Sequence, residues 1–131
     1  MSKNNMDNEV TRHPICWAII SGLTTSSQYA GIKTLLENND IKPVGSPYMA
    51  GFEDMALAQL GNTDYMLKHA NDYWGEILRN KATTFWEAYD PQEITDKQYS
   101  FYGRPYAKSL CHVWSADPAA LLLADRTKAN G

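Results

Sequence analysis

Apolar residues recur every three or four positions over two long stretches of the chain, and this spacing constrains the fold more than any other feature. Between residues 46 and 61 the recurring residues are Phe52, Met55, Ala56 and Leu60. Between residues 64 and 80 they are Leu67, Ala70, Trp74, Ile77 and Leu78. A period close to 3.6 is typical of helices with one buried face, and no segment alternates convincingly as a half-buried strand does. The sequence therefore predicts an all-α fold.

Residues that favour helix starts divide the chain further. Ser46 and Asp117 are suitable N-caps, and each is followed by a proline, which is tolerated in the first turn of a helix. Pro14 opens an apolar stretch over 14–24, and Ser26 is a suitable cap for the helix after it. With a further start at Asp64 and a short helix over 107–115, these signals predict six helices, beginning near residues 14, 26, 46, 64, 107 and 117.

Length and charge limit the classes of protein to consider. A chain of 131 residues with 44% apolar and 21% charged residues is typical of one soluble globular domain. We expect that domain to span residues 9–125, between flexible termini at 1–8 and 126–131. A net charge of −3 provides no basic surface for nucleic acid or for an anionic membrane. The apolar runs "ICWAII" and "AALLLA" are too short to cross a bilayer, and the first ten residues lack a secretory signal, so we expect a cytoplasmic protein.

The cysteines and the polar residues indicate neither a disulfide nor a cofactor site. Cys16 and Cys111 are far apart in the sequence and form no C-x-x-C pair, so we expect two buried free thiols. No metal-ligand spacing, phosphate-binding loop or Ser-His-Asp arrangement is visible. We therefore expect no metal and no cofactor.

Between residues 82 and 106 the helical period disappears while aromatic residues become dense. The seven aromatic residues of this stretch are Phe85, Trp86, Tyr89, Tyr99, Phe101, Tyr102 and Tyr106. A loop longer than about a dozen residues in a compact domain is usually functional or disordered, and disordered segments are poor in aromatics. Aromatic faces with polar neighbours suit a sugar ligand, although pockets for heterocycles or peptides share this composition.

Two motifs in and after this loop resemble a known enzyme family. The stretches "KATTFWEAYDP" and "GRPYAKSLCHVWSADPAALL" resemble the C-terminal part of the alpha-L-rhamnosidases, with a T-T-x-W-E segment, an S-L-x-H helix and a final apolar helix. The stretch 45–87 also follows the family's order, from a Ser-Pro-Tyr helix start to a helix that ends in W-G-x-x-L. The resemblance covers roughly residues 9–124. It implies a six-hairpin glycosidase fold, an (α/α)6 toroid, of which the six expected helices would form about half.

The resemblance also implies roles for individual residues. Glu87 matches the glutamate of the W-E motif, which is understood to act as the general base that activates water in an inverting hydrolysis. Trp86 beside it would shape the sugar site and make its surroundings more apolar. His112 matches the histidine of S-L-x-H, which in this family contacts the substrate.

Further substrate-binding candidates rest on position alone, in the loop or after the proline of a helix start, and they are Tyr89, Tyr102, Arg104 and Tyr48. Structural alternatives stay open for the residues that match motifs. Glu87 would otherwise cap a turn or pair with Lys81 or Arg104. His112 has apolar neighbours in the sequence and would otherwise be a core residue with satisfied hydrogen bonds.

Other conspicuous side chains have structural explanations. Glu53 and Asp54 are adjacent on a helix, so they are not expected to both point inward, and a solvated face is the simpler interpretation. His13 and His69 match no motif and are expected at the surface or near helix caps. The tryptophans on helical faces are expected in the core, and these are Trp17, Trp74 and Trp114.

The resemblance leaves part of a glycosidase site unaccounted for. The family's general acid lies in an upstream loop that no stretch of this sequence matches, and inverting hydrolysis needs two carboxyl groups roughly 6.5–9.5 Å apart. We therefore expect a C-terminal fragment of an inverting glycoside hydrolase that is inactive alone and that self-associates or joins a chain carrying the first half of the barrel. A non-catalytic carbohydrate-binding module and a helical protein-interaction module remain as alternatives.

Overall fold

The computed structural model of the chain describes residues 11–41, 45–90, 93 and 95–129, and within them the protein is all-α, as predicted. The α-helices are α1 (Arg12–Ile20), α2 (Tyr29–Glu37), α3 (Pro47–Gln59), α4 (Thr63–Arg79) and α5 (Asp117–Ala129). The 3₁₀ turns are η1 (Ser26–Gln28), η2 (Thr95–Tyr99) and η3 (Val113–Ser115). These residues contain no strand beyond an isolated antiparallel bridge between Phe101 and Arg104. The segment 1–8, which we expected to be flexible, lies outside the described residues.

The predicted helix start at Ser46 and Pro47 is confirmed, whereas α5 starts one residue earlier than predicted, because Asp117 is its first residue rather than its cap. The Ser46 hydroxyl accepts a hydrogen bond from the Met49 N–H at 3.3 Å, and Pro47 is the first residue of α3. Helix α5 begins at Asp117, directly before Pro118. Both prolines are buried, so each fixes the backbone at a helix start and also contributes apolar area to the interior.

Three other predicted boundaries are wrong. Helix α1 begins at Arg12 and ends at Ile20, and Gly22 then adopts a left-handed φ of 71° that a side chain would disfavour. Ser26 opens a 3₁₀ turn, so the α-helix after it starts only at Tyr29. The expected helix over 107–115 is absent except for η3, because this segment pairs its backbone with residues 84–87.

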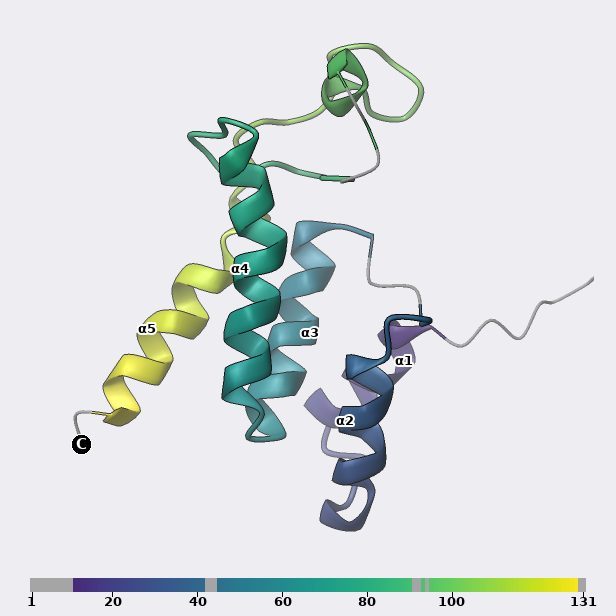
Figure 1. The fold of residues 1–131 in the computed structure, drawn as a ribbon, viewed down its shortest axis with the longest axis vertical. Coiled ribbons are helices and arrows are strands. Elements are labelled where there is room, and N and C mark those ends of the chain that lie inside the picture. Colours follow the sequence, from purple (N-terminus) through teal and green to yellow (C-terminus); the bar gives the residue numbers. More distant parts are fainter. Residues whose placement is uncertain (1–10, 42–44, 91–92, 94, 130–131) are drawn as a thin grey trace, which may run out of the picture.

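Helix α3 is the central element of the fold. It packs against α1, α4 and α5, whereas α2 lies against α1 (Figure 1). The helices α1, α3 and α5 therefore form a row of neighbours in chain order. The described residues between 82 and 112 follow the C-terminal end of α4, include the green segment that projects beyond the helices in Figure 1, and lead back to the start of α5.

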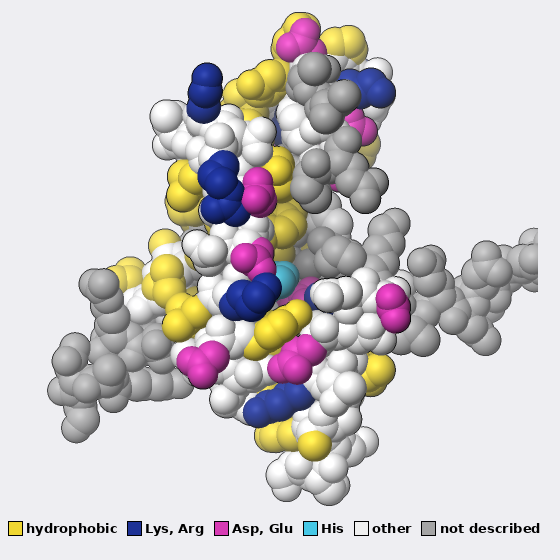
Figure 2. All heavy atoms as spheres, in the orientation of Figure 1, with side chains coloured by type: hydrophobic (Ala, Val, Ile, Leu, Met, Phe, Trp, Pro, Cys, Tyr) yellow, Lys and Arg dark blue, Asp and Glu magenta, His cyan; other side chains and the backbone are white. Residues whose placement is uncertain are grey.

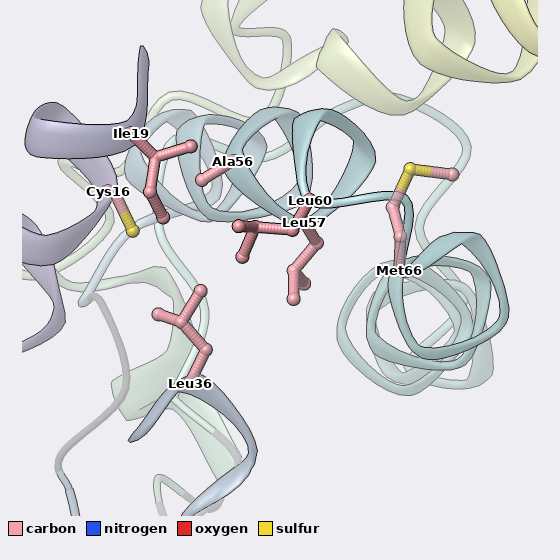
Figure 3. Close-up of a cluster of buried hydrophobic side chains, with 7 residues drawn as sticks. All are labelled: Cys16, Ile19, Leu36, Ala56, Leu57, Leu60 and Met66. Atoms are coloured by element: carbon pink, nitrogen blue, oxygen red, sulfur yellow. The ribbon is translucent and has the colours of Figure 1, made fainter. Parts of the chain in front are cut away.

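The interior consists of two clusters of buried apolar side chains. The first joins four helices and contains Cys16, Ile19, Leu36, Ala56, Leu57, Leu60 and Met66. Figure 3 shows side chains of α1, α2 and α3 directed into the space between these helices. The second cluster contains Ala50, Trp74, Ile77, Ala82, Trp86 and Tyr89. Because its last three members lie in the loop that follows α4, the second cluster fixes the start of that loop against α3 and α4.

The surface over α4 is mostly polar, with Leu67 and Leu78 exposed among the charged residues. Figure 2 shows basic and acidic side chains next to one another there, and this helix carries the ion pairs Lys68–Asp72 at 2.5 Å and Arg79–Glu76 at 2.7 Å. Such exposed ion pairs contribute little to the free energy of folding, and their main effect is to make this face of the helix hydrophilic. Among the described helices, none has the length and the apolar character that a membrane span requires.

Candidate functional site

The two motifs that carry the family resemblance are paired backbone to backbone. The N–H of Glu87 donates to the Ser109 carbonyl at 2.9 Å, and the N–H of His112 donates to the Phe85 carbonyl at 2.7 Å. The Thr84 hydroxyl donates to the Leu110 carbonyl. Segments 84–87 and 109–112 therefore form a short ladder. We call this paired unit the motif ladder.

The motif ladder fixes the side chain of Glu87. Its Oε2 atom accepts a hydrogen bond from the Ser109 N–H at 3.0 Å, and the side chain is half-buried. Hydrogen bonds to a carboxylate are about twice as strong as those between neutral groups, so this contact holds the group in one orientation. The alternative ion pairs with Lys81 and Arg104 are not formed in the part of the chain that the structure describes.

Trp86 directly precedes Glu87 in the motif ladder, and Lys108 directly precedes the ladder's second segment. Trp86 is 4% exposed and packs edge-on against Tyr99, with ring centroids 6.0 Å apart. The Lys108 ammonium lies 6.0 Å from the centre of the Trp86 ring, close enough for a cation–π interaction. Partial burial lowers the pKa of Lys108, and the negative charges of Glu93, Asp90 and Glu87 oppose that effect.

Tyr89 lies in the interior rather than on an open surface. It is 8% exposed, its hydroxyl accepts a hydrogen bond from the Asn80 amide at 3.1 Å, and its ring meets Tyr73 edge-on. These contacts give Tyr89 a structural role at the end of α4. Its predicted contact with a substrate stays a prediction.

Tyr102 and Arg104 lie at the tip of a hairpin. The N–H and the carbonyl of Phe101 pair with those of Arg104 at 3.1 and 3.0 Å, and the two residues between them have positive φ, 49° at Tyr102 and 71° at Gly103. Positive φ at both central positions is typical of a type I′ turn. Tyr102 is 88% exposed, and no hydrogen bond or ring contact joins either candidate to Glu87 among the described residues. The structure does not bring these two candidates together with Glu87.

Tyr48 and His112 belong to a run of rings that continues from the motif ladder across α3 to α1. Neighbouring ring centroids are 4.7 Å apart for Trp17–Phe52, 5.1 Å for Phe52–Tyr48, 5.7 Å for Tyr48–Trp114 and 6.0 Å for Trp114–His112. We call these five residues the aromatic run. Trp17 and Trp114 are 46% and 64% exposed, so the expectation that they are core residues is wrong. The expectation for Trp74, which is buried, is confirmed.

A buried charge cluster escaped the sequence analysis. The Arg12 guanidinium bonds to Glu53, His69 Nδ1 bonds to Asp54 Oδ1 at 2.6 Å, and both carboxylates have no exposed surface. The solvated face expected for Glu53 and Asp54 and the surface position expected for His69 are therefore wrong. Adjacent helical residues point about 100° apart, but α3 is covered by α1, α4 and α5, so both positions are inside. No pattern in the sequence indicated that α3 is contacted on several sides, and these contacts are what bury Glu53 and Asp54.

The groups of the cluster shift the pKa values of Asp54 and His69, but among the described residues they do not form a metal site. Burial raises the pKa of Asp54, and the hydrogen bond and charge of His69 oppose this rise. Burial lowers the pKa of His69, but the hydrogen bond to Asp54 and the charges of Asp54 and Glu53 outweigh it, so that pKa lies above its ordinary value. Within the described residues, no group of three or more His, Cys, Asp or Glu side chains is arranged to hold a metal ion.

A comparison of the chain with protein-family models finds no match, and neither does a comparison with curated protein sequences.

Proposed function

We propose that this chain is the C-terminal part of an inverting glycoside hydrolase domain similar to the alpha-L-rhamnosidases, with Glu87 as its general base. The observation that carries the proposal is the motif ladder. The T-T-F-W-E and S-L-C-H stretches, which together carry the resemblance to the family, are hydrogen-bonded to each other, and the Glu87 carboxylate accepts a hydrogen bond from Ser109. A general base must be fixed in orientation to take a proton from water, and this contact fixes it.

The packing of the helices supports the finer fold proposal, an incomplete (α/α)6 toroid. In a ring of helical hairpins, the first helix of each hairpin lies beside the first helix of the next. The neighbours α1, α3 and α5 fit this pattern, with α2 against α1 and α4 against α3. Two hairpins, α1–α2 and α3–α4, and the single helix α5 at the third position make five of the twelve helices of a six-hairpin ring.

The second part of the proposal is that the 131-residue chain does not hydrolyse glycosides on its own. Protonation of the leaving group and activation of water are separate tasks for two carboxyl groups. The resemblance assigns the general acid to a loop that has no counterpart in this sequence. The proposed partner is a chain that carries the first half of such a barrel, and the proposed ligand is a rhamnoside or a similar sugar.

One observation favours a second candidate function, a carbohydrate-binding module without catalysis. The aromatic run presents partly exposed rings from α1, α3 and η3, and Trp114 is its most exposed indole. Aromatic faces bind the apolar faces of sugar rings. Binding of this kind does not need Glu87, whereas the hydrolase proposal does.

The test combines sugar binding with complementation. L-rhamnose is titrated into the protein while tryptophan fluorescence is recorded, with D-glucose as the matched control sugar. Hydrolysis of 4-nitrophenyl α-L-rhamnoside is measured for the chain alone and after mixing with the first half of an alpha-L-rhamnosidase barrel. We expect a saturable response to rhamnose, no hydrolysis by the chain alone, and hydrolysis in the mixture that Glu87→Gln abolishes.

The other outcomes separate the candidates. A flat response to rhamnose into the high-millimolar range counts against both. Rhamnose binding that survives Glu87→Gln but is lost in Trp114→Ala, without hydrolysis in any mixture, supports the binding module. Hydrolysis by the chain alone contradicts the proposed inactivity.

A further inference from the structure

A network of buried polar groups connects four of the helices. Arg12 on α1 bonds to Glu53 on α3 and donates from Nη2 to the Asn38 carbonyl at the end of α2, at 2.9 Å. On α4, His69 bonds through Nδ1 to Asp54 at 2.6 Å, and its Nε2 lies 3.9 Å from Glu53 Oε1. The imidazole is therefore the only link in this network between α3 and α4 among the described residues.

The network leaves buried polar atoms of both kinds without a partner. Glu53 Oε2, Asp54 Oδ2 and Arg12 Nε are buried and have no hydrogen-bond partner in the described part of the chain. Two carboxyl groups, those of Glu53 and Asp54, face one guanidinium, so with both ionised and His69 neutral the network would carry one excess negative charge away from water. Isolated buried charge is strongly unfavourable, and a proton on His69 would neutralise the network.

We propose that Arg12, Glu53, Asp54 and His69 form a proton-dependent latch between α3 and α4, which holds while the imidazole is protonated and loosens when it loses its proton. A protonated imidazole donates from both nitrogens. It can then satisfy Asp54 at hydrogen-bond distance and attract Glu53 across 3.9 Å. A neutral imidazole keeps one donor and leaves the excess charge in place.

Some of the groups around His69 raise the pKa of its imidazole and others lower it, and their net effect is to raise it. Facing it from α3 are Asp54 and Glu53, which attract the proton, and from α1 Arg12, which repels it. The Cys16 thiol of α1 also borders the carboxylates, and Asp117 of α5 acts on Asp54. On α4 itself, His69 stacks on the Tyr73 ring, with centroids 6.4 Å apart. The positive charge of His69 also contributes to lowering the pKa of Asp72.

The direction of the pH effect follows from proton linkage. The folded state binds the proton on His69 more tightly than the unfolded chain does, so the latch contributes fully below about pH 6.5 and is lost as the pH rises through the folded pKa. Asp54 acts in the same direction, because its pKa is also raised on folding. Each unit of difference between folded and unfolded pKa changes the folding equilibrium constant about tenfold.

The experiment is urea unfolding of the full chain at intervals from about pH 6 to about pH 9, for the wild type and two variants. His69→Asn keeps an amide donor near the position of Nδ1 but cannot titrate, and His13→Asn removes a half-buried imidazole from α1 as the control. We expect the folding equilibrium constant of the wild type and of His13→Asn to fall as the pH rises. In His69→Asn, most of this fall should disappear.

An NMR titration of the three imidazoles in the wild type keeps the proposal testable if His69→Asn does not fold. The latch requires that His69 titrates above about pH 6.5, with a chemical-shift change in the α3–α4 contact over the same pH range. A folded His69 that titrates at or below that pH overturns the proposal. The same pH slope in His69→Asn as in the wild type also overturns it.

Discussion

Glu87 and Ser109 bond to each other in both directions. The Ser109 N–H donates to the Glu87 carboxylate at 3.0 Å, while the Glu87 N–H donates to the Ser109 carbonyl at 2.9 Å. The carboxylate that the resemblance marks as a general base is therefore also a structural group, because it helps to join two segments on either side of a long loop. Variants of Glu87 have to be interpreted with both roles in mind.

The first prediction separates the carboxylate's structural role from its charge. Glu87→Ala leaves the Ser109 N–H without its partner and should lower the free energy of unfolding by about 1–3 kcal/mol. Glu87→Gln should cost less, because the amide oxygen can accept the same hydrogen bond. Urea denaturation measures both, with Glu93→Ala as the control at an exposed carboxylate of the same loop. A loss in Glu87→Ala no larger than in Glu93→Ala would show that the contact does not stabilise the fold.

The second prediction concerns the close contact of α3 with the start of α5. A Cβ atom on Gly51 would lie 2.5 Å from Cγ of Asp117, which is too close for any side chain. Gly51→Ala gains about 1 kcal/mol of helix propensity, but forcing the first turn of α5 away should cost more, for a net loss of about 1–3 kcal/mol. Gly31→Ala is the matched control, because nothing lies within 4 Å of its Cβ position and α2 should be stabilised by up to about 1 kcal/mol. In thermal and urea unfolding, the stability change should be negative for Gly51→Ala and positive for Gly31→Ala. A change of the same sign in both variants would contradict the close packing of α3 against α5.

The elements that could be predicted from the sequence are those specified by local chemistry. Ser46 caps α3 directly before Pro47, and α5 begins at Asp117 directly before Pro118; both starts were found because a polar residue followed by a proline acts within one turn. The apolar stripe of α4 identifies Trp74 and Ile77 as buried for a similar reason, but the burial predicted for Leu67 and Leu78 of the same stripe is wrong, because both are exposed. Each of these features depends on residues only a few positions apart.

The features that the sequence did not reveal depend on contacts between distant segments. Residues 107–112 have a helical composition, but their hydrogen bonds go to residues 84–87, and this pairing overrides the local preference. Glu53 and Asp54 are buried because α3 is surrounded, and Arg12 and His69 reach them from 41 and 15 positions away. No pattern within one helix contains that information. Trp17 and Trp114 each pack against one ring of α3, Phe52 and Tyr48 respectively, and remain 46% and 64% exposed.

The third prediction tests how the motif ladder is attached to α4. The indole N–H of Trp74 donates to the Ser115 carbonyl at 2.9 Å in a buried contact just before α5. Trp74→Phe removes this donor and part of the ring, so the free energy of unfolding should fall by about 2–4 kcal/mol from the unpaired carbonyl and the cavity together. Trp114→Phe, at an exposed ring of the aromatic run, should change it by less than about 1 kcal/mol.

Hydrogen exchange gives a second measurement for the same pair of variants. If the bond to Ser115 attaches the ladder to α4, the amides of Ser109 and His112 should exchange faster in Trp74→Phe and unchanged in Trp114→Phe. Equal protection in both variants would show that the ladder is held by its own hydrogen bonds alone.

The fourth prediction concerns the two thiols, which the sequence suggested were both buried. Cys16 is 1% exposed, whereas Cys111 is exposed, and neither forms a disulfide. Burial raises the pKa of Cys16 to about 12, and the negative charge of Glu53 adds to this effect more than Arg12 opposes it. Because the thiolate is the reactive form, Cys16 should stay inert at neutral and mildly alkaline pH while Cys111 reacts.

Counting thiols with an aromatic disulfide reagent measures this difference. One thiol per native chain should react in a fast phase, and the second only at the rate of unfolding or after addition of denaturant. Cys111→Ser should remove the fast phase and leave the slow one, and Cys16→Ser should do the reverse. Cys16 lies near the latch carboxylates, so loosening of the α3–α4 contact at high pH should speed the slow reaction of its thiol. A slow phase whose rate rises with pH only as the thiolate fraction does would show that this part of the interior stays closed.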